Sequence, residues 1–202
     1  MSNDRLSIRT DRLLLRTIVN SDIQHIYQGL SNPLVIKHYG VSFDSLAATQ
    51  EQMTWYASPE QCWWVICSTN GQEFYGAGGL NGISKAHQKA EIGLWLLPDF
   101  GGKGIMQEAM PLICAYGFDQ LRLHRIEGFV ETNNHNCKRA MAKLNFKYEG
   151  KMRDCEVKNG QFISVDIYAL LKSDETFTPI QHQCVRRKTN QTSRPAPFEK
   201  SK

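Results

Sequence analysis

The sequence predicts an α/β domain. Runs of alternating apolar residues and runs with apolar residues at helical spacing follow one another in the order β-α-α-β-β-β-α-β-α-β-β. The chain has 202 residues, of which 41% are hydrophobic and 22% are charged, as is typical of globular proteins. A chain of this length buries about 70% of its unfolded surface, so it needs no disulfide or metal to fold.

The first half of the chain predicts one strand, two helices and a hairpin. Residues 12–18 alternate as in a strand, and Asn20 and Asp22 can cap a helix over residues 23–30. Pro33 ends that helix because the residue before a proline disfavours helical dihedrals. The other elements expected here are a helix over residues 45–56 and strands over residues 63–67 and 74–80, with a hairpin turn at Asn70-Gly71.

The second half begins with an apolar strand over residues 90–97 and a long amphipathic helix over residues 104–118. Pro111 lies inside this helix, where a proline costs about 3 kcal/mol, so we expect a kink or a local break there. The remaining elements are a strand over residues 125–130, a helix over residues 136–144, and a closing hairpin of strands over residues 146–157 and 162–171.

Composition and charge narrow the class of protein. The net charge of +4 and the pI of about 8.7 suit an anionic ligand and are too weak to indicate DNA binding. The six cysteines lack the spacing of a zinc site, so we expect reduced thiols, no metal and a cytoplasmic protein. The polar amino terminus has no signal-peptide pattern, and no apolar run reaches the roughly 18 residues that cross a bilayer, so no membrane partner is expected.

The composition changes after Lys172. Residues 173–202 hold six basic and three acidic side chains, several prolines and few large apolar residues. We therefore expect a catalytic or binding domain over residues 6–172 and a basic, disordered tail over residues 173–202. Contact of this tail with ribosomal RNA is the less favoured interpretation.

The stretch from Glu91 to Ala109 is the most informative part of the chain. An apolar strand leads through Gly101-Gly102-Lys103-Gly104 into a helix, which places free backbone N–H groups and the positive end of the helix dipole at one point. Such a point binds phosphate groups. The loop is no nucleoside-triphosphate P-loop, because Gly104 stands where that motif has serine or threonine, and its spacing excludes a dinucleotide fingerprint.

Further segments accompany this loop: residues 10–16, 91–95, 123–127, 146–150 and 166–171, and the run that begins Asn134-x-x-Cys-Lys-Arg. In their order and spacing, they resemble the GNAT acetyltransferase superfamily, and most closely its RimJ/RimL-like branch of ribosomal-protein N-terminal and polyamine acetyltransferases. The resemblance covers residues 6–172. It implies the GNAT fold, with a mixed central β-sheet of about six or seven strands flanked by about four helices.

The resemblance implies transfer of an acetyl group from acetyl-CoA to a primary amine, with no metal. A protein N-terminal α-amine is the leading acceptor, and a polyamine or another small amine is the alternative. The alternative from a different functional class is a protein that binds CoA without catalysing a reaction and acts as a sensor or an interaction module. Both a monomer and a homodimer remain open, and the expected acceptor-side loops, residues 33–61 and 153–162, carry no readable specificity.

The resemblance also implies which residues bind acetyl-CoA. The loop departs from the family pattern at Gly101 and Met106, and Met106 would either crowd the pyrophosphate or turn into the core. Asn134 could cap a loop instead of contacting CoA. The expected contacts are Leu94, Trp95, Leu96 and Leu97 along the pantetheine arm, Gly101, Gly102, Lys103, Gly104, Ile105, Met106 and Gln107 at the pyrophosphate, and Asn134 and Cys137 near the end of the arm.

Three residues are candidates for the chemistry. Glu91 is the expected general base, because a carboxylate in an apolar groove has a raised pKa. A salt bridge on the strand face, or a water chain with no single base, is the alternative. The N–H near Leu96 is the expected oxyanion donor, and Cys137 could protonate the leaving thiolate or be an ordinary residue on a helix surface.

Other positions set limits on the mechanism. Met141 and Phe129 stand where relatives carry a catalytic tyrosine and a second glutamate, so those groups are absent here. Trp63, Trp64 and Trp95 could wall an acceptor pocket, although aromatic residues at such spacings more often form the core.

Overall fold

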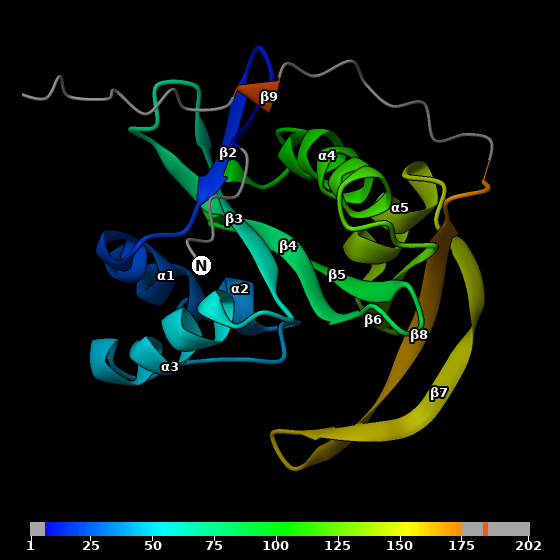
Figure 1. Cartoon of the computed structure of the whole chain (residues 1–202). Coiled ribbons are helices and arrows are strands. Elements are labelled where there is room, and N and C mark those ends of the chain that lie inside the picture. The colour runs from blue at the N-terminus through cyan, green and yellow to red at the C-terminus, as the bar shows by residue number, and fades with distance from the viewer. Residues whose placement is uncertain (1–6, 175–183, 186–202) are drawn as a thin grey trace, which may run out of the picture.

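The computed structural model describes residues 7–174 and 184–185 (Figure 1). Its strands are β1 (Ser7–Arg9), β2 (Leu13–Thr17), β3 (Cys62–Ser68), β4 (Phe74–Ser84), β5 (Lys89–Leu96), β6 (Arg125–Glu131), β7 (Lys147–Lys158), β8 (Gln161–Leu171) and β9 (Cys184–Val185). Its helices are α1 (Ile23–Leu30), α2 (Pro33–Ile36), α3 (Leu46–Ala57), α4 (Ile105–Asp119) and α5 (His135–Lys143), with 3-10 turns at Asn20–Asp22 and Pro98–Phe100. Every strand and helix expected from the sequence is present.

The strands form one mixed sheet in the order β7-β8-β6-β5-β4-β3-β2-β1-β9. Among the described residues, β5 and β6 run parallel and the other neighbouring pairs run antiparallel. The expected mixed sheet is confirmed, and the short strands β1 and β9 add to the expected strand count at one edge. β9 falls within the expected tail, whose residues 175–183 and 186–202 lie outside the described part of the chain.

Helices cover both faces of the sheet, with α4 and α5 on one face and α1 and α3 on the other (Figure 1). Strand β3 is buried on both faces, which explains its unbroken apolar sequence. Its residues Cys62, Trp64 and Ile66 join the core beneath α4, and Trp63, Val65 and Cys67 join the core beneath α1 and α3.

The glycines of β4 and β5 make room for Trp63. A Cβ atom on Gly79 would lie 2.5 Å from an atom of the Trp63 ring, and one on Gly93 would lie 2.8 Å from it. No real Cβ approaches a neighbour so closely, so the large indole can lie against these strands only where side chains are missing.

Helix α4 continues unbroken through Pro111, so of the two expected outcomes, a kink or a local break, the break is absent. A proline removes only one N–H donor from the helix, and the hydrogen bonds and buried residues on either side hold the remaining turns. The helix is 15 residues long. No helix in the described part of the chain is long and apolar enough to cross a membrane.

Candidate active site

The site opens where β5 and β6 separate. Their parallel pairing joins Lys89, Ala90 and Glu91 to Arg125, Ile126 and Glu127, and beyond this point β5 pairs with β4 in the described structure. A groove of about 1260 Å³ is lined by residues on both sides of the opening. This separation of β5 and β6 beyond Glu91 and Glu127, which we call the fork, creates a passage through the sheet. Helices α4 and α5 lie on one side of it, and α2 and α3 lie on the other.

The free edge of β5 presents backbone groups to this opening. The N–H of Leu97 donates to the carbonyl of Tyr75 over 2.9 Å, on the β4 side. Because successive N–H groups of an extended chain point to opposite edges, the N–H of Leu96 faces the opening. An extended ligand could pair with this edge as an added strand.

The glycine loop forms the first wall of the groove. Gly102 (φ +74°) and Gly104 (φ +78°) have left-handed dihedrals, and a Cβ on Gly102 would meet no atom within 4 Å. Gly104 is the N-cap of α4 and supplies no side-chain cap, so the first N–H groups of the helix are available to a ligand. An open cradle with these donors fits a pyrophosphate group.

Helix α5 forms the wall opposite the loop. The side-chain oxygen of Asn134 accepts a hydrogen bond from the N–H of Cys137 over 3.1 Å, so Asn134 caps this helix. Asn134 and Cys137 both line the groove. Burial raises the pKa of Cys137 to about 11, which keeps the thiol protonated and makes it a weaker acid than an ordinary thiol.

The structure brings most of the expected CoA-binding residues together. Leu97 and Lys103 do not line the groove: Leu97 is buried in the core beneath α1, and the Lys103 ammonium lies 5.0 Å from the centre of the Phe100 ring. Met106 lines the groove and also packs partly against the core beneath α4, so both expected roles stay open. The groove-lining residues are Leu94, Trp95, Leu96, Gly101, Gly102, Gly104, Ile105, Met106, Gln107, Asn134 and Cys137.

Glu91 lies at the fork, on the sheet face opposite α4 and α5. It is half-buried and lines the groove, and the Asn81 side chain hydrogen-bonds to it from β4. Burial raises the pKa of Glu91, the hydrogen bond from Asn81 opposes this, and the neighbouring carboxylates of Glu127 and Glu156 raise it further. The nearby Lys89 pairs with Glu127 instead. Lys89 therefore does not supply the salt bridge that is the alternative role for Glu91.

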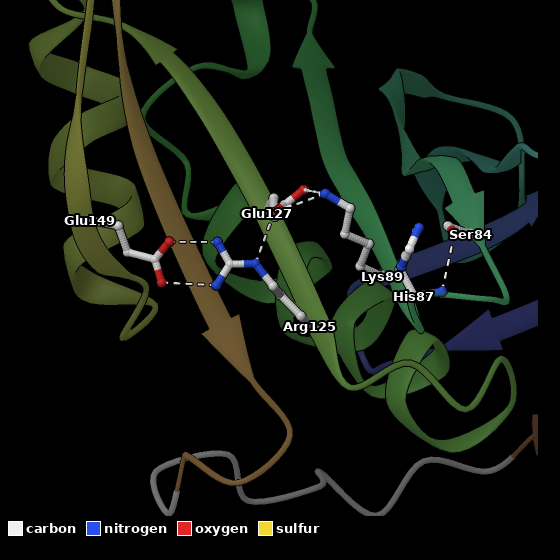
Figure 2. Close-up of polar contacts among 6 residues, drawn as sticks. All are labelled: Ser84, His87, Lys89, Arg125, Glu127 and Glu149. Carbon is white, nitrogen blue, oxygen red and sulfur yellow. Dashed lines mark hydrogen bonds and ion pairs between the residues drawn. The ribbon is translucent and has the colours of Figure 1, made fainter.

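A network of charges surrounds Glu127 (Figure 2), which pairs with Glu91 in the register of β5 and β6. Lys89 Nζ lies 3.0 Å from one Glu127 oxygen, and Arg125 Nε donates to the other over 2.8 Å. Arg125 also forms an ion pair with Glu149. Burial acts to raise the pKa of Glu127, but these hydrogen bonds outweigh it and the pKa is lowered. Glu127 therefore remains ionised next to a carboxyl group that holds its proton more tightly.

The three tryptophans are core residues, which is the more frequent role of aromatic residues at such spacings. Trp63, Trp64 and Trp95 are each at most 3% exposed. Trp64 packs against Tyr116 beneath α4, on the sheet face opposite to the one that carries Glu91. Trp63 and Trp95 also contribute to the groove wall, so for these two the core and pocket roles coincide.

Sequence reasoning missed a second polar cluster at the end of β6. Glu131 binds His38 Nδ1 over 2.8 Å and Lys158 Nζ over 2.5 Å, and Lys158 also donates to the carbonyl of Lys37 over 2.7 Å. The cluster thus ties the end of α2 and the β7–β8 hairpin to the groove. Alternation along β6, which puts Glu127, Phe129 and Glu131 on one face, is the signal that could have found its central residue.

Comparison with known proteins identifies similar chains. A sequence model of the Acetyltransferase (GNAT) domain matches residues 12–147. YoaA of Bacillus subtilis (strain 168), named an uncharacterised N-acetyltransferase, is 29% identical over 173 residues, which cover 83% of this chain and 98% of that protein. YdaF of the same strain, which its name proposes to be a ribosomal N-acetyltransferase, is 33% identical over 95 residues, which cover 47% of this chain and 52% of that protein.

A solved structure shows the same architecture. The crystal structure of spermidine N-acetyltransferase from Vibrio cholerae, in complex with CoA and spermine, matches with a TM-score of 0.75 at 21% identity. The match covers 81% of this chain and 98% of that one. At this identity the likeness confirms the expected fold and leaves the acceptor open.

Proposed function

The chain belongs to the GNAT acetyltransferase family, whose members use acetyl-CoA, and we propose that it acetylates the N-terminal α-amine of a protein. Acetyl transfer to an amine follows from the family; the acceptor is our proposal. The fork between β5 and β6 supports the transfer, because it joins an anion cradle on one side to an ionisable carboxyl group on the other, and the ribosomal acetyltransferase activity that the name of YdaF proposes favours a protein acceptor.

Residues on the α4 side would hold the cosubstrate. The first N–H groups of α4 would bind the pyrophosphate, and the free edge of β5 would pair with the amide groups of the pantetheine arm. Asn134 keeps its side-chain N–H donors available after capping α5. These contacts would bring the thioester to the fork.

Glu91 and Leu96 would serve the chemistry at the fork. An amine attacks the thioester carbonyl only after its ammonium form has lost a proton, and Glu91 is placed to accept that proton from the acceptor side. The Leu96 N–H would donate a hydrogen bond to the carbonyl oxygen as negative charge develops on it. The raised pKa of Cys137 makes its role as the final acid less favourable, so solvent is the simpler proton donor to the thiolate.

A polyamine acceptor is the second candidate. Three carboxylates, Glu51, Glu91 and Glu131, line the groove and would attract a cationic amine. The name of the Vibrio cholerae structure gives the same substrate class for that protein. An N-terminal amine is also a cation, so this charge alone does not separate the two.

Thiol release from acetyl-CoA with a panel of amines tests the proposal. The panel contains peptides with free N-termini, the same peptides with blocked N-termini and one lysine, and spermidine. We expect release with the free N-termini only, and mass spectrometry should place one acetyl group on the α-amine. Binding of CoA without transfer to any amine would instead support the non-catalytic sensor.

A further inference from the structure

Exposed apolar side chains gather at the acceptor side of the groove. Eight large hydrophobic residues are exposed in the described part of the chain. Two of them, Val19 and Tyr148, neither line a described cavity nor pair across strands with a residue that does. The other six form what we call the apolar rim: Leu34, Val41, Trp55, Phe129, Val157 and Phe162.

Five members of the apolar rim line the two connected cavities, and the sixth, Phe162, pairs with one of them in the hairpin. Leu34, Val41, Trp55 and Phe129 line the main groove. A second cavity of about 520 Å³ shares Tyr39, Gly40 and Val41 with that groove and extends to Val157 at the hairpin tip. Phe162 lies directly opposite Val157 in the hairpin, so the two side chains point to the same face.

The polar cluster around Glu131 fixes this arrangement. Lys158, at the hairpin tip, contacts both Glu131 and the carbonyl of Lys37, which follows α2. Figure 1 shows the long β7–β8 hairpin reaching past the sheet toward the level of α2 and α3. The rim is thus built from segments far apart in sequence and held together by one lysine and one carboxylate.

We propose that the apolar rim binds the apolar side chains that follow the N-terminal amine of an extended protein acceptor. This inference rests on the proposed function and adds the chemistry of the acceptor. Exposed apolar clusters of this kind mark binding surfaces. The arrangement suits a molecule with one cationic end, which reaches Glu91, and an apolar body, which remains at the entrance.

Two other occupants fit the rim less well. A polyamine carries ammonium groups along its length, and seating it would press charge against apolar side chains. A small apolar amine would fill the groove, but it would not reach Phe162, which is 72% exposed and lines neither cavity. An occupant that reaches both Glu91 and Phe162 would have to extend out of the groove and past the tip of the β7–β8 hairpin.

Paired peptides and paired variants test the inference. The peptides share their first residue and carry either leucine and phenylalanine or serine and asparagine at the next three positions. The variants are Leu34→Ser and Phe162→Ser, with Val19→Ser as the matched control, because Val19 is 49% exposed and lies outside the rim. Thiol release gives kcat and KM, and calorimetry on the CoA-loaded protein gives peptide affinity.

We expect each rim variant to raise the KM for the apolar peptide by about three- to tenfold, with kcat and the KM for acetyl-CoA unchanged. The polar peptide and the Val19→Ser variant should show no such change. Equal affinity for the two peptides would overturn the inference, as would rim variants that leave the apolar-peptide KM unchanged. A dimer that Phe162→Ser dissociates without changing peptide KM would overturn it in favour of a second copy of the chain.

The design separates the two possible failures. If peptides bind with a preference for the apolar sequence but no amine is acetylated, the binding role of the apolar rim is supported and the proposed acetyltransferase function is refuted. If free N-termini are acetylated without regard to the following residues, the proposed function stands and the rim fails.

Discussion

Replacing Glu91 by glutamine tests the centre of the mechanism. Glutamine has the size of glutamate and can still hydrogen-bond to Asn81, but it cannot accept a proton at neutral pH. A positioned general base contributes about 10²- to 10⁴-fold to a rate, so kcat should fall by that factor, equivalent to about 3–5 kcal/mol of barrier. The KM for acetyl-CoA should not change, because Glu91 lies on the acceptor face.

The pH dependence should change as well. The pKa of Glu91 is raised, chiefly by burial, so the base form is present only above a pH higher than an ordinary glutamate requires. The wild-type rate should therefore fall as pH drops through this raised pKa, and the variant should lack that limb. Glu60→Gln is the matched control, since this carboxylate is exposed and lines neither described cavity.

Thermal stability distinguishes chemistry from damage to the fold. A carboxyl group with a raised folded-state pKa contributes stability at low pH that is lost as pH rises through that pKa. At neutral pH the ionised, half-buried Glu91 therefore destabilises the protein, and Glu91→Gln should melt at the same or a higher temperature. An unchanged pH–rate profile in a folded variant would remove Glu91 from the mechanism and favour a water chain.

Three further changes probe the cofactor side and the scaffold. Gly102→Val places a branched side chain at φ +74°, at a strain of about 1–2 kcal/mol, so calorimetry should show weaker CoA binding, while Gly101→Ala at φ −62° should bind normally. Asp166→Ala removes the buried carboxylate that lies 2.6 Å from Lys138 Nζ and accepts a hydrogen bond from Thr132, so denaturant titrations should show a lower free energy of unfolding. Met106→Ala should cost about 1 kcal/mol of stability and leave CoA affinity within about twofold, because its side chain packs partly on the core; a large gain in affinity would show that Met106 crowds the pyrophosphate.

Local sequence patterns predicted the elements of the fold well. The strand–glycine–helix stretch around Gly102 and Gly104 needs only short-range signals, namely an apolar run, residues that tolerate positive φ, and apolar residues at helical spacing. The same signals predicted the closing hairpin at Asn159-Gly160, where both residues have positive φ. The local break, one of the two outcomes expected at Pro111, does not occur, because tertiary packing and the neighbouring turns can carry a helix past one lost hydrogen bond.

The sequence alone predicted the family, from the order and spacing of its segments, and it predicted the anion cradle and Glu91 as a candidate base from residues close together in the chain. Only the tertiary structure decided where β5 and β6 separate, that Glu127 rather than Glu91 takes the neighbouring cations, and that Glu131 joins His38 to Lys158. These features depend on strand register and on contacts between residues up to 121 positions apart, such as the one from Lys158 to Lys37. No local periodicity encodes such contacts, and they are the ones that shape the acceptor side.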